Sequence, residues 1–304
     1  MDRLAPGVSY VDLMFRSTPR IVATAVIQGP RGVALLDPGP TSTLPTLEAE
    51  LEKSGIKPGD VSDIVLTHIH LDHAGATGTL VRRNPALRVF VHEKGAPHMV
   101  DPARLLASAG RLYGDQMERL WGEVAPVPAK VLTTLAGGER IEAGGRRFDV
   151  AYTPGHASHH VSYFNDETGL AFVGDTAGIK RTASGIVVAP TPPPDIDLES
   201  WETSLRKIEA WRPDTLFITH FGPASPYAPH LNALREHLQV TTGLVRESLA
   251  RDGTDEDREA WFTDRVRLEL RRRMNEADAL AYEVAGRFDL NWRGLARYLR
   301  KKAG

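Results

Sequence analysis

The chain has 304 residues, of which 41% are hydrophobic and 25% are charged, with a formal net charge of -2 and no cysteine. This composition is typical of a globular protein with one large domain, or one domain and an appendage. The charge balance indicates neither a nucleic-acid partner nor a membrane surface, and the lack of cysteine excludes disulfides and thiolate metal sites. No apolar segment could act as a signal core or span a bilayer, so we expect a cytoplasmic protein.

The first third of the chain predicts strands joined to helices. Segments rich in β-forming residues and bounded by glycine and proline predict strands at residues 20–28, 33–37, 61–67 and 87–92. Helical spacing predicts helices at residues 43–55, with Pro45 in the first turn, and at residues 73–83. The apolar strand 61–67 leads directly into an unusual polar cluster.

That cluster contains three histidines and one aspartate within six positions: His68, His70, Asp72 and His73. Imidazole and carboxylate groups are the ligands that zinc and similar metals prefer. In a loop between a strand and a helix, side chains with this spacing can converge on one point. The cluster therefore predicts a metal site.

The middle of the chain predicts a helical region at residues 97–123, followed by a return to strands. Strands are expected at residues 139–142, 146–153, 161–164, 170–173 and 215–219, with a proline-rich loop near residue 192 and a helix at residues 198–211. His156, Asp175 and His220 each follow one of these strands and lie beside glycine. Five histidines and two aspartates are enough for two metal ions that each keep an open position.

The motif HxHxDH at residues 68–73, with Thr153-Pro154-Gly155-His156, Gly174-Asp175-Thr176 and His220, resembles the metallo-β-lactamase superfamily. The resemblance extends from about residue 23 to residue 220. It implies an α/β fold, a four-layer αββα sandwich with the metals at one edge. It also implies that His68, His70 and His156 bind one metal, that Asp72, His73 and His220 bind the other, and that Asp175 bridges both together with a hydroxide.

We expect Asp72 and Asp175 to be catalytic, since Asp72 could also deliver a proton to the leaving group. Asp37, Thr67 and Thr219 are candidates for orienting the ligand histidines. His159 and His160 are interpreted mainly as structural, although His160 could support the site. Tyr163, Phe221, Tyr227 and the proline-rich loop could line the substrate space.

Beyond residue 229 the strand pattern disappears and helices are predicted at residues 231–251, 255–274, 277–286 and 291–301. We therefore expect a catalytic domain at residues 1–228 and a helical extension at residues 229–304. The extension could cover the site or form a homodimer interface.

These features predict a dinuclear metallohydrolase that uses a bridging hydroxide to cleave an ester-type carbonyl bond in a lactone, thioester or related acyl compound. The expected cofactors are two divalent ions, zinc first, with manganese or iron as alternatives. We expect a small-molecule substrate and no nucleic-acid or membrane partner. Two alternatives stay open: a phosphodiesterase with the same site, and iron-dependent oxygen or sulfur chemistry.

Overall fold

The computed structural model describes residues 1–182 and 185–303, so three residues of the predicted domain ranges (183, 184 and 304) lie outside it. Within the described residues the strands form two sheets. The first sheet has seven strands in sequence order: β1 (Asp2–Ala5), β2 (Val8–Asp12), β3 (Ala23–Gly29), β4 (Gly32–Leu36), β5 (Val61–Val65), β6 (Arg88–His92) and β7 (Leu132–Leu135). The second sheet, within the described residues, has the strand order β13 (Gly222–Ala224), β12 (Thr215–Ile218), β11 (Leu170–Phe172), β10 (Val161–Asn165), β9 (Arg146–Tyr152) and β8 (Arg140–Ala143).

The two sheets pack face to face because alternate side chains of each strand point to opposite faces. In β3, Ala25 and Ile27 lie in the core between the sheets, whereas Val26 lies in the core on the outer face. From the second sheet, Phe148 and Phe172 enter the core between the sheets, where their rings meet edge to face at 6.0 Å. Strand β3 is thus apolar on both faces.

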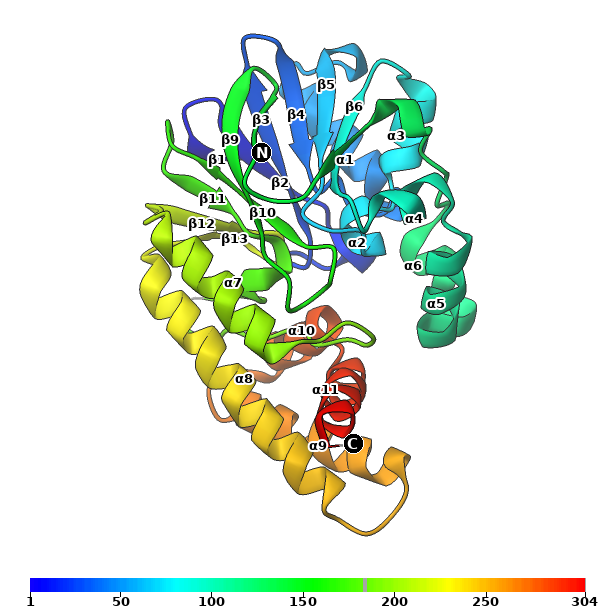
Figure 1. Cartoon of the computed structure of the whole chain (residues 1–304), viewed down its shortest axis with the longest axis vertical. Helices are drawn as coiled ribbons and strands as arrows, with labels where there is room; N and C mark the ends of the chain where they lie inside the picture. The colour runs from blue at the N-terminus through cyan, green and yellow to red at the C-terminus, as the bar shows by residue number, and fades with distance from the viewer. Residues whose placement is uncertain (183–184, 304) are drawn as a thin grey trace.

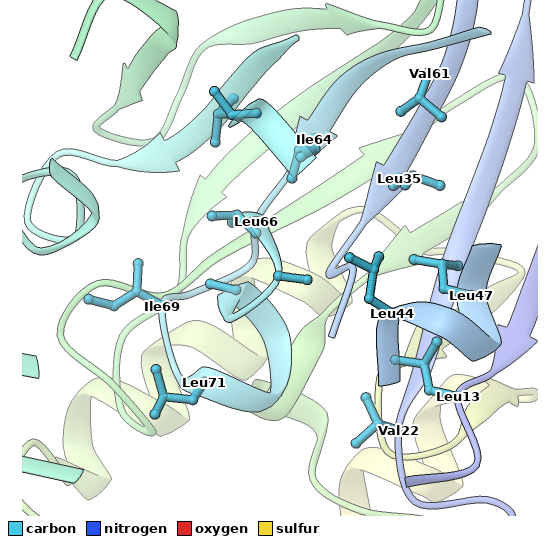
Figure 2. Close-up of a cluster of buried hydrophobic side chains, with 14 of the residues drawn as sticks. Leu13, Val22, Leu35, Leu44, Leu47, Val61, Ile64, Leu66, Ile69 and Leu71 are labelled. Carbon is cyan, nitrogen blue, oxygen red and sulfur yellow. The ribbon is translucent and has the colours of Figure 1, made fainter. Parts of the chain in front are cut away.

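Helices cover the outer face of the first sheet, as Figure 1 shows on the right of the upper half. They are α1 (Leu44–Lys53), α2 (Leu71–Ala74), α3 (Thr77–Arg83), α4 (Ala96–Val100), α5 (Ala103–Tyr113) and α6 (Met117–Trp121). Helix α1 places Leu44 and Leu47 on one face by their spacing, and these side chains pack toward Leu35 of β4 (Figure 2). This layer completes one side of the sandwich.

The outer face of the second sheet is covered by α7 (Leu198–Ala210) and by the helices of the C-terminal region, α8 (Tyr227–Leu249), α9 (Asp255–Arg271), α10 (Glu276–Gly286) and α11 (Phe288–Ala303). Trp201 of α7, Leu231 of α8 and Phe262 of α9 are fully buried in one apolar cluster with Ala171 of β11 and Leu216 of β12. The four-layer αββα sandwich with C-terminal helices is therefore confirmed. The division into domains at residue 228 stays a prediction.

Two of the predicted helices are interrupted. Residues 73–83 form parts of α2 and α3, because the Ala76 N–H donates to the Gly39 carbonyl (2.8 Å) instead of continuing the helical ladder. The region 97–123 is divided at Pro102, which forces Asp101 into an extended conformation, and at Gly114, which has a φ of 54°. The short strands β1, β2, β7 and β13 were not predicted.

The helices in the described part of the chain are too short or too polar to cross a membrane.

Candidate metal centre

All seven predicted ligands lie at the carboxyl ends of strands, at one edge of the sandwich. His68, His70, Asp72 and His73 follow β5, and His156 follows β9. Asp175 lies in a 3₁₀ turn, Gly174–Ala177, after β11, and His220 follows β12. Strands β4 and β5 are parallel, as are β11 and β12, so their carboxyl ends meet at the same edge.

Apolar residues between the polar ones anchor the loop after β5. Leu66, Ile69 and Leu71 are 0%, 1% and 5% exposed and belong to the apolar cluster under the helices. In Figure 2 their side chains point into that cluster along the path of the loop. Because these three side chains are buried, the polar side chains between them are directed to the other side, where the candidate centre lies.

The first group of donors consists of three histidines. Nε2 of His68 and Nε2 of His156 each lie 3.0 Å from Nδ1 of His70. Such convergence of three ring nitrogens is the arrangement expected of a three-histidine metal site.

The second group consists of Asp72, His73 and His220. Nε2 of His73 lies 3.3 Å from Nε2 of His220, which in turn lies 3.4 Å from Oδ2 of Asp72. The Asp72 side chain is 26% exposed, whereas those of the two histidines are 0% and 3% exposed. Asp72 is therefore the member of this group that is most accessible to solvent or a substrate.

Asp175 lies between the two groups. Its Oδ1 is 3.1 Å from Nε2 of His73 and 3.4 Å from Nε2 of His220, and its Oδ2 is 3.4 Å from Nε2 of His156. Its two oxygens thus face different groups. Oδ1 is buried and accepts no hydrogen bond from any residue that the structure describes.

The hydrogen bonds on the far side of the rings test whether these residues fit a metal. The Nδ1 atoms of His156 and His220 donate to the carbonyl oxygens of Pro190 (2.8 Å) and Ile21 (2.6 Å), and Nδ1 of His73 lies 2.9 Å from Oδ2 of Asp37. A neutral imidazole with its proton on Nδ1 presents a lone pair at Nε2. Lone pairs of His73 and His220 then face each other at 3.3 Å, an arrangement that a cation between them would stabilise. The donor set fits metal ions.

Asp37 connects three strand ends beneath the centre. It is fully buried and adopts a positive φ of 51°. Its Oδ2 accepts hydrogen bonds from the hydroxyls of Thr67 (2.7 Å) and Thr219 (2.8 Å) as well as facing His73, and its Oδ1 accepts from the Thr67 N–H (2.8 Å). The predicted candidates Asp37, Thr67 and Thr219 thus form one network that orients His73.

His160 also belongs to this surrounding layer. Its Nε2 accepts a hydrogen bond from the Asp175 N–H at 3.2 Å, and its ring stacks on that of His68 with centroids 5.0 Å apart. Nδ1 lies 3.0 Å from the Thr153 hydroxyl. His160 therefore supports Asp175 directly, whereas His159 lies at the wall of the adjacent cavity. The sequence distinguished the roles of His159 and His160 poorly, because both residues follow the same motif at residues 153–156.

The two groups of donors differ in the direction in which their surroundings shift the pKa values of their members. Burial lowers the pKa of His68 and His156, and it lowers the pKa of His70 to about 4. Burial opposes ionisation of Asp72 as well, but His73 and His220 outweigh it and lower the pKa of Asp72 to about 2. Burial disfavours the charged forms of His73 and His220, but Asp175 and Asp72 outweigh it and raise the pKa of both. The first group therefore offers neutral nitrogens and the second an ionised carboxylate, and a metal ion bound by the second group would displace the protons that the carboxylates favour on its two histidines.

A cavity of about 420 Å³ opens onto the donors. His70, Asp72, His156, Asp175 and His220 form its floor, and its walls come from α5, α6, the proline-rich loop, and α10 and α11. The prediction that the proline-rich loop lines the substrate space is consistent with Pro190 and Pro192–Pro194 in this wall. Tyr163, Phe221 and Tyr227 are absent from the described lining, so that prediction was wrong: Tyr163, for instance, is buried between the sheets and donates to the Leu66 carbonyl.

Comparison with known proteins gives one family. The family model described as metallo-beta-lactamase superfamily matches residues 17–220. The chain is 29% identical to the metallo-beta-lactamase fold-containing protein ST1585 of Sulfurisphaera tokodaii, over 74% of this chain and 84% of that protein.

Two further proteins are similar to this chain over very different shares of its length. A hydroxyacylglutathione hydrolase of Legionella pneumophila is 28% identical, but the match covers 41% of this chain and 38% of that enzyme. The crystal structure of the metallo-beta-lactamase family protein TTHA1429 from Thermus thermophilus aligns with a TM-score of 0.74 at 23% identity, covering 99% of this chain and 95% of that one. The second similarity extends through the C-terminal helices and concerns the fold.

Proposed function

The chain belongs to the metallo-β-lactamase superfamily and is a metallohydrolase of that fold, and on this basis we propose that it is a dinuclear enzyme that hydrolyses an ester-type carbonyl bond. The observation that carries the proposal is the position of Asp175, whose two oxygens face two separate groups of donors. A single metal ion would need only one of these groups.

We assign His68, His70 and His156 to one ion, Asp72, His73 and His220 to the other, and Asp175 to both. When bound, two divalent ions would supply Lewis acidity, which polarises a substrate oxygen and lowers the pKa of water toward neutrality. Five nitrogen and two carboxylate donors suit zinc, and they also suit manganese and iron. Zinc is the proposed native metal.

The residues of the chain supply positioning and proton transfer. Asp37, Ile21 and Pro190 hold Nδ1 of three ligand histidines, which keeps the rings directed at the centre. Asp72 lines the cavity and is partly exposed, so its carboxylate, which is ionised at rest, can accept a proton from the attacking water and pass it to the leaving group as the bond breaks. His160 keeps the backbone of Asp175 in place.

The walls of the cavity favour an acyl substrate. Leu105, Leu112, Tyr113, Trp121 and Leu290 give it a largely apolar surface away from the donors. An apolar wall gains free energy from contact with the carbon skeleton of a lactone or thioester, at about 25 cal/mol per Å² of buried apolar area. A phosphodiester without an apolar group would gain little from this wall.

One observation favours the second candidate, phosphodiester hydrolysis. Lys94 and Arg104 lie at the wall of the cavity, and both are exposed. Arg104 makes no ion pair or hydrogen bond with the described residues. Cations at this position would attract an anionic substrate, which includes phosphodiesters as well as acyl compounds with a carboxylate.

The test uses the full chain loaded with zinc, manganese or iron. Lactones, thioesters and p-nitrophenyl esters are compared with bis-p-nitrophenyl phosphate, and metal content is measured in the same samples. We expect two ions per chain and a kcat/KM for the best acyl substrate at least about 100-fold above that for the phosphodiester. A preference for the phosphodiester would reject the acyl assignment, and one ion per chain under saturating metal would reject the dinuclear centre.

A further inference from the structure

The segment Ala189–Thr191, in the loop before α7, lies against the candidate centre. The carbonyl oxygen of Pro190 accepts the hydrogen bond from Nδ1 of His156 at 2.8 Å. Pro190 has no N–H, so its own backbone cannot be held by a donated hydrogen bond. The position of this carbonyl therefore depends on the two neighbouring residues.

One side chain of α11 holds both neighbours. Oδ1 of Asn291 accepts a hydrogen bond from the Thr191 N–H at 2.7 Å, and Nδ2 of Asn291 donates to the Ala189 carbonyl at 3.3 Å. The Thr191 hydroxyl in turn donates to the Asn291 carbonyl at 3.2 Å. Asn291 is only 3% exposed, so these bonds are largely shielded from water.

The backbone of α11 lies directly on the same loop. A Cβ atom added to Gly294 would collide with the Thr191 carbonyl oxygen and would lie 2.9 Å from the carbonyl carbon of Pro192. Only glycine permits this approach. On the other side of the helix, Nε1 of Trp292 donates to the Ser248 hydroxyl of α8 at 2.8 Å. The helix is thus fixed between α8 and the loop.

We propose that Asn291 is a positioning residue for the metal group of His68, His70 and His156. It fixes the Pro190 carbonyl, which selects the His156 tautomer with its proton on Nδ1 and directs Nε2 to the metal. This inference depends on the dinuclear centre proposed above. Loss of a group that orients a metal ligand typically lowers metal affinity about 10- to 100-fold.

The position of Asn291 at the cavity wall could also suggest contact with substrate. Its amide oxygen and nitrogen, however, both bond to the loop backbone. An indirect role, in which Asn291 holds the loop that orients His156, therefore accounts for both polar atoms of its side chain. Such a role predicts that substitution changes one metal site and leaves the other, which a general loss of packing would not do.

The experiment measures zinc affinity of the full chain by competition with a chromogenic chelator, together with the visible absorption of the cobalt-loaded protein. In Asn291→Ala we expect one of the two ions to bind about 10- to 100-fold more weakly and the second to keep its affinity. Its cobalt spectrum should shift toward that of His156→Ala and away from that of His220→Ala.

Two further variants make the result specific. Asn291→Asp is nearly isosteric and keeps an acceptor for the Thr191 N–H, but it places a buried carboxylate oxygen against the Ala189 carbonyl, so a loss at the same site is expected here too. Trp292→Phe removes the bond from α11 to Ser248 without touching the loop, so it should lower the melting temperature and leave both zinc affinities unchanged.

The outcomes separate the two proposals. Two ions bound with wild-type affinities in both Asn291 variants would overturn the positioning role and leave the dinuclear centre intact. Equal weakening of both ions, or the same weakening in Trp292→Phe, would also overturn it, because general destabilisation would then explain the effect. Fewer than two ions in the wild-type protein would contradict the dinuclear centre itself.

Discussion

The segments that follow β4, β5, β9, β11 and β12 contribute carboxylates and imidazoles to the centre and its support. Helices α5, α10 and α11 instead contribute apolar walls and contacts that hold the loop before α7. Most of the strand-end residues are almost fully buried, with Asp72 partly exposed, and several are bonded to one another, so each of these depends on others. The wall residues, in contrast, line the cavity individually rather than as a hydrogen-bonded network. Substitutions at the strand ends should therefore cause loss of bound metal or of folding stability. Substitutions in the helices should alter substrate binding and turnover.

The largest effect is expected from Asp175→Ala. This substitution removes both oxygens that lie between the two groups of donors. We expect kcat/KM to fall on the order of 10³-fold or more with every substrate, together with loss of bound metal. Steady-state kinetics and elemental analysis measure these changes. Asp166→Ala, in the exposed turn between β10 and β11, is the matched control and should behave like wild type. Full activity of Asp175→Ala would exclude its central role.

Asp37→Ala should mainly affect folding. It removes the acceptor of two threonine hydroxyls and one backbone N–H, all in a fully buried place. Leaving these donors without a partner should lower the free energy of unfolding by about 3 kcal/mol or more. Urea denaturation of the metal-loaded protein tests this. Asp37→Asn retains one acceptor oxygen and should lose less; an equal loss in both variants would contradict the network.

A pH-dependent effect is expected at His230 of α8. Burial lowers the pKa of His230 to about 4, and its Nε2 donates to the Ala177 carbonyl at 2.7 Å while Nδ1 is buried without a partner among the described residues. The unfolded chain binds a proton near pH 6.5, and the folded chain binds it only near pH 4. Stability is therefore lost as the pH falls from about 6.5 to 4, by up to about 3 kcal/mol.

His230→Gln keeps an N–H in a similar position and cannot be protonated. Melting temperatures of the metal-loaded wild type and variant between about pH 7 and pH 4 should show a shallower acid loss in the variant. Parallel curves would mean that His230 does not titrate differently in the two states.

The smallest effect is expected from Tyr113→Phe. Tyr113 lines the cavity, packs edge to face on Trp121 at 5.0 Å, and its hydroxyl has no hydrogen-bond partner in the described part of the chain. Burial and the nearby Asp72 raise the pKa of Tyr113, so the hydroxyl remains a donor. We expect kcat/KM to fall about tenfold with unchanged metal content. Tyr298→Phe is the control, because Tyr298 is not among the cavity-lining residues and its hydroxyl bonds to Glu199. A loss of metal in Tyr113→Phe would remove the distinction between the walls and the donors.

Much of the centre could be predicted from the sequence because its donors occur in short local patterns. The spacing of His68, His70, Asp72 and His73 in one loop is visible without any tertiary contact, and so is the position of His156 or His220 after an apolar strand. Runs of β-forming residues bounded by glycine and proline similarly indicate strands such as β3 and β4, since this signal depends only on residues that are neighbours in the sequence.

Other features were decided only by tertiary structure. The break between α2 and α3 results from a hydrogen bond to Gly39, and the acceptors for His156 and His220 are backbone carbonyls, which every residue has and no residue type reveals. The contact of Asn291 with the loop joins residues 100 positions apart in the chain. Local sequence thus determined which atoms can bind a metal, whereas the folded chain decided which of their neighbours hold them in place, because those contacts arise from long-range packing rather than from side-chain identity.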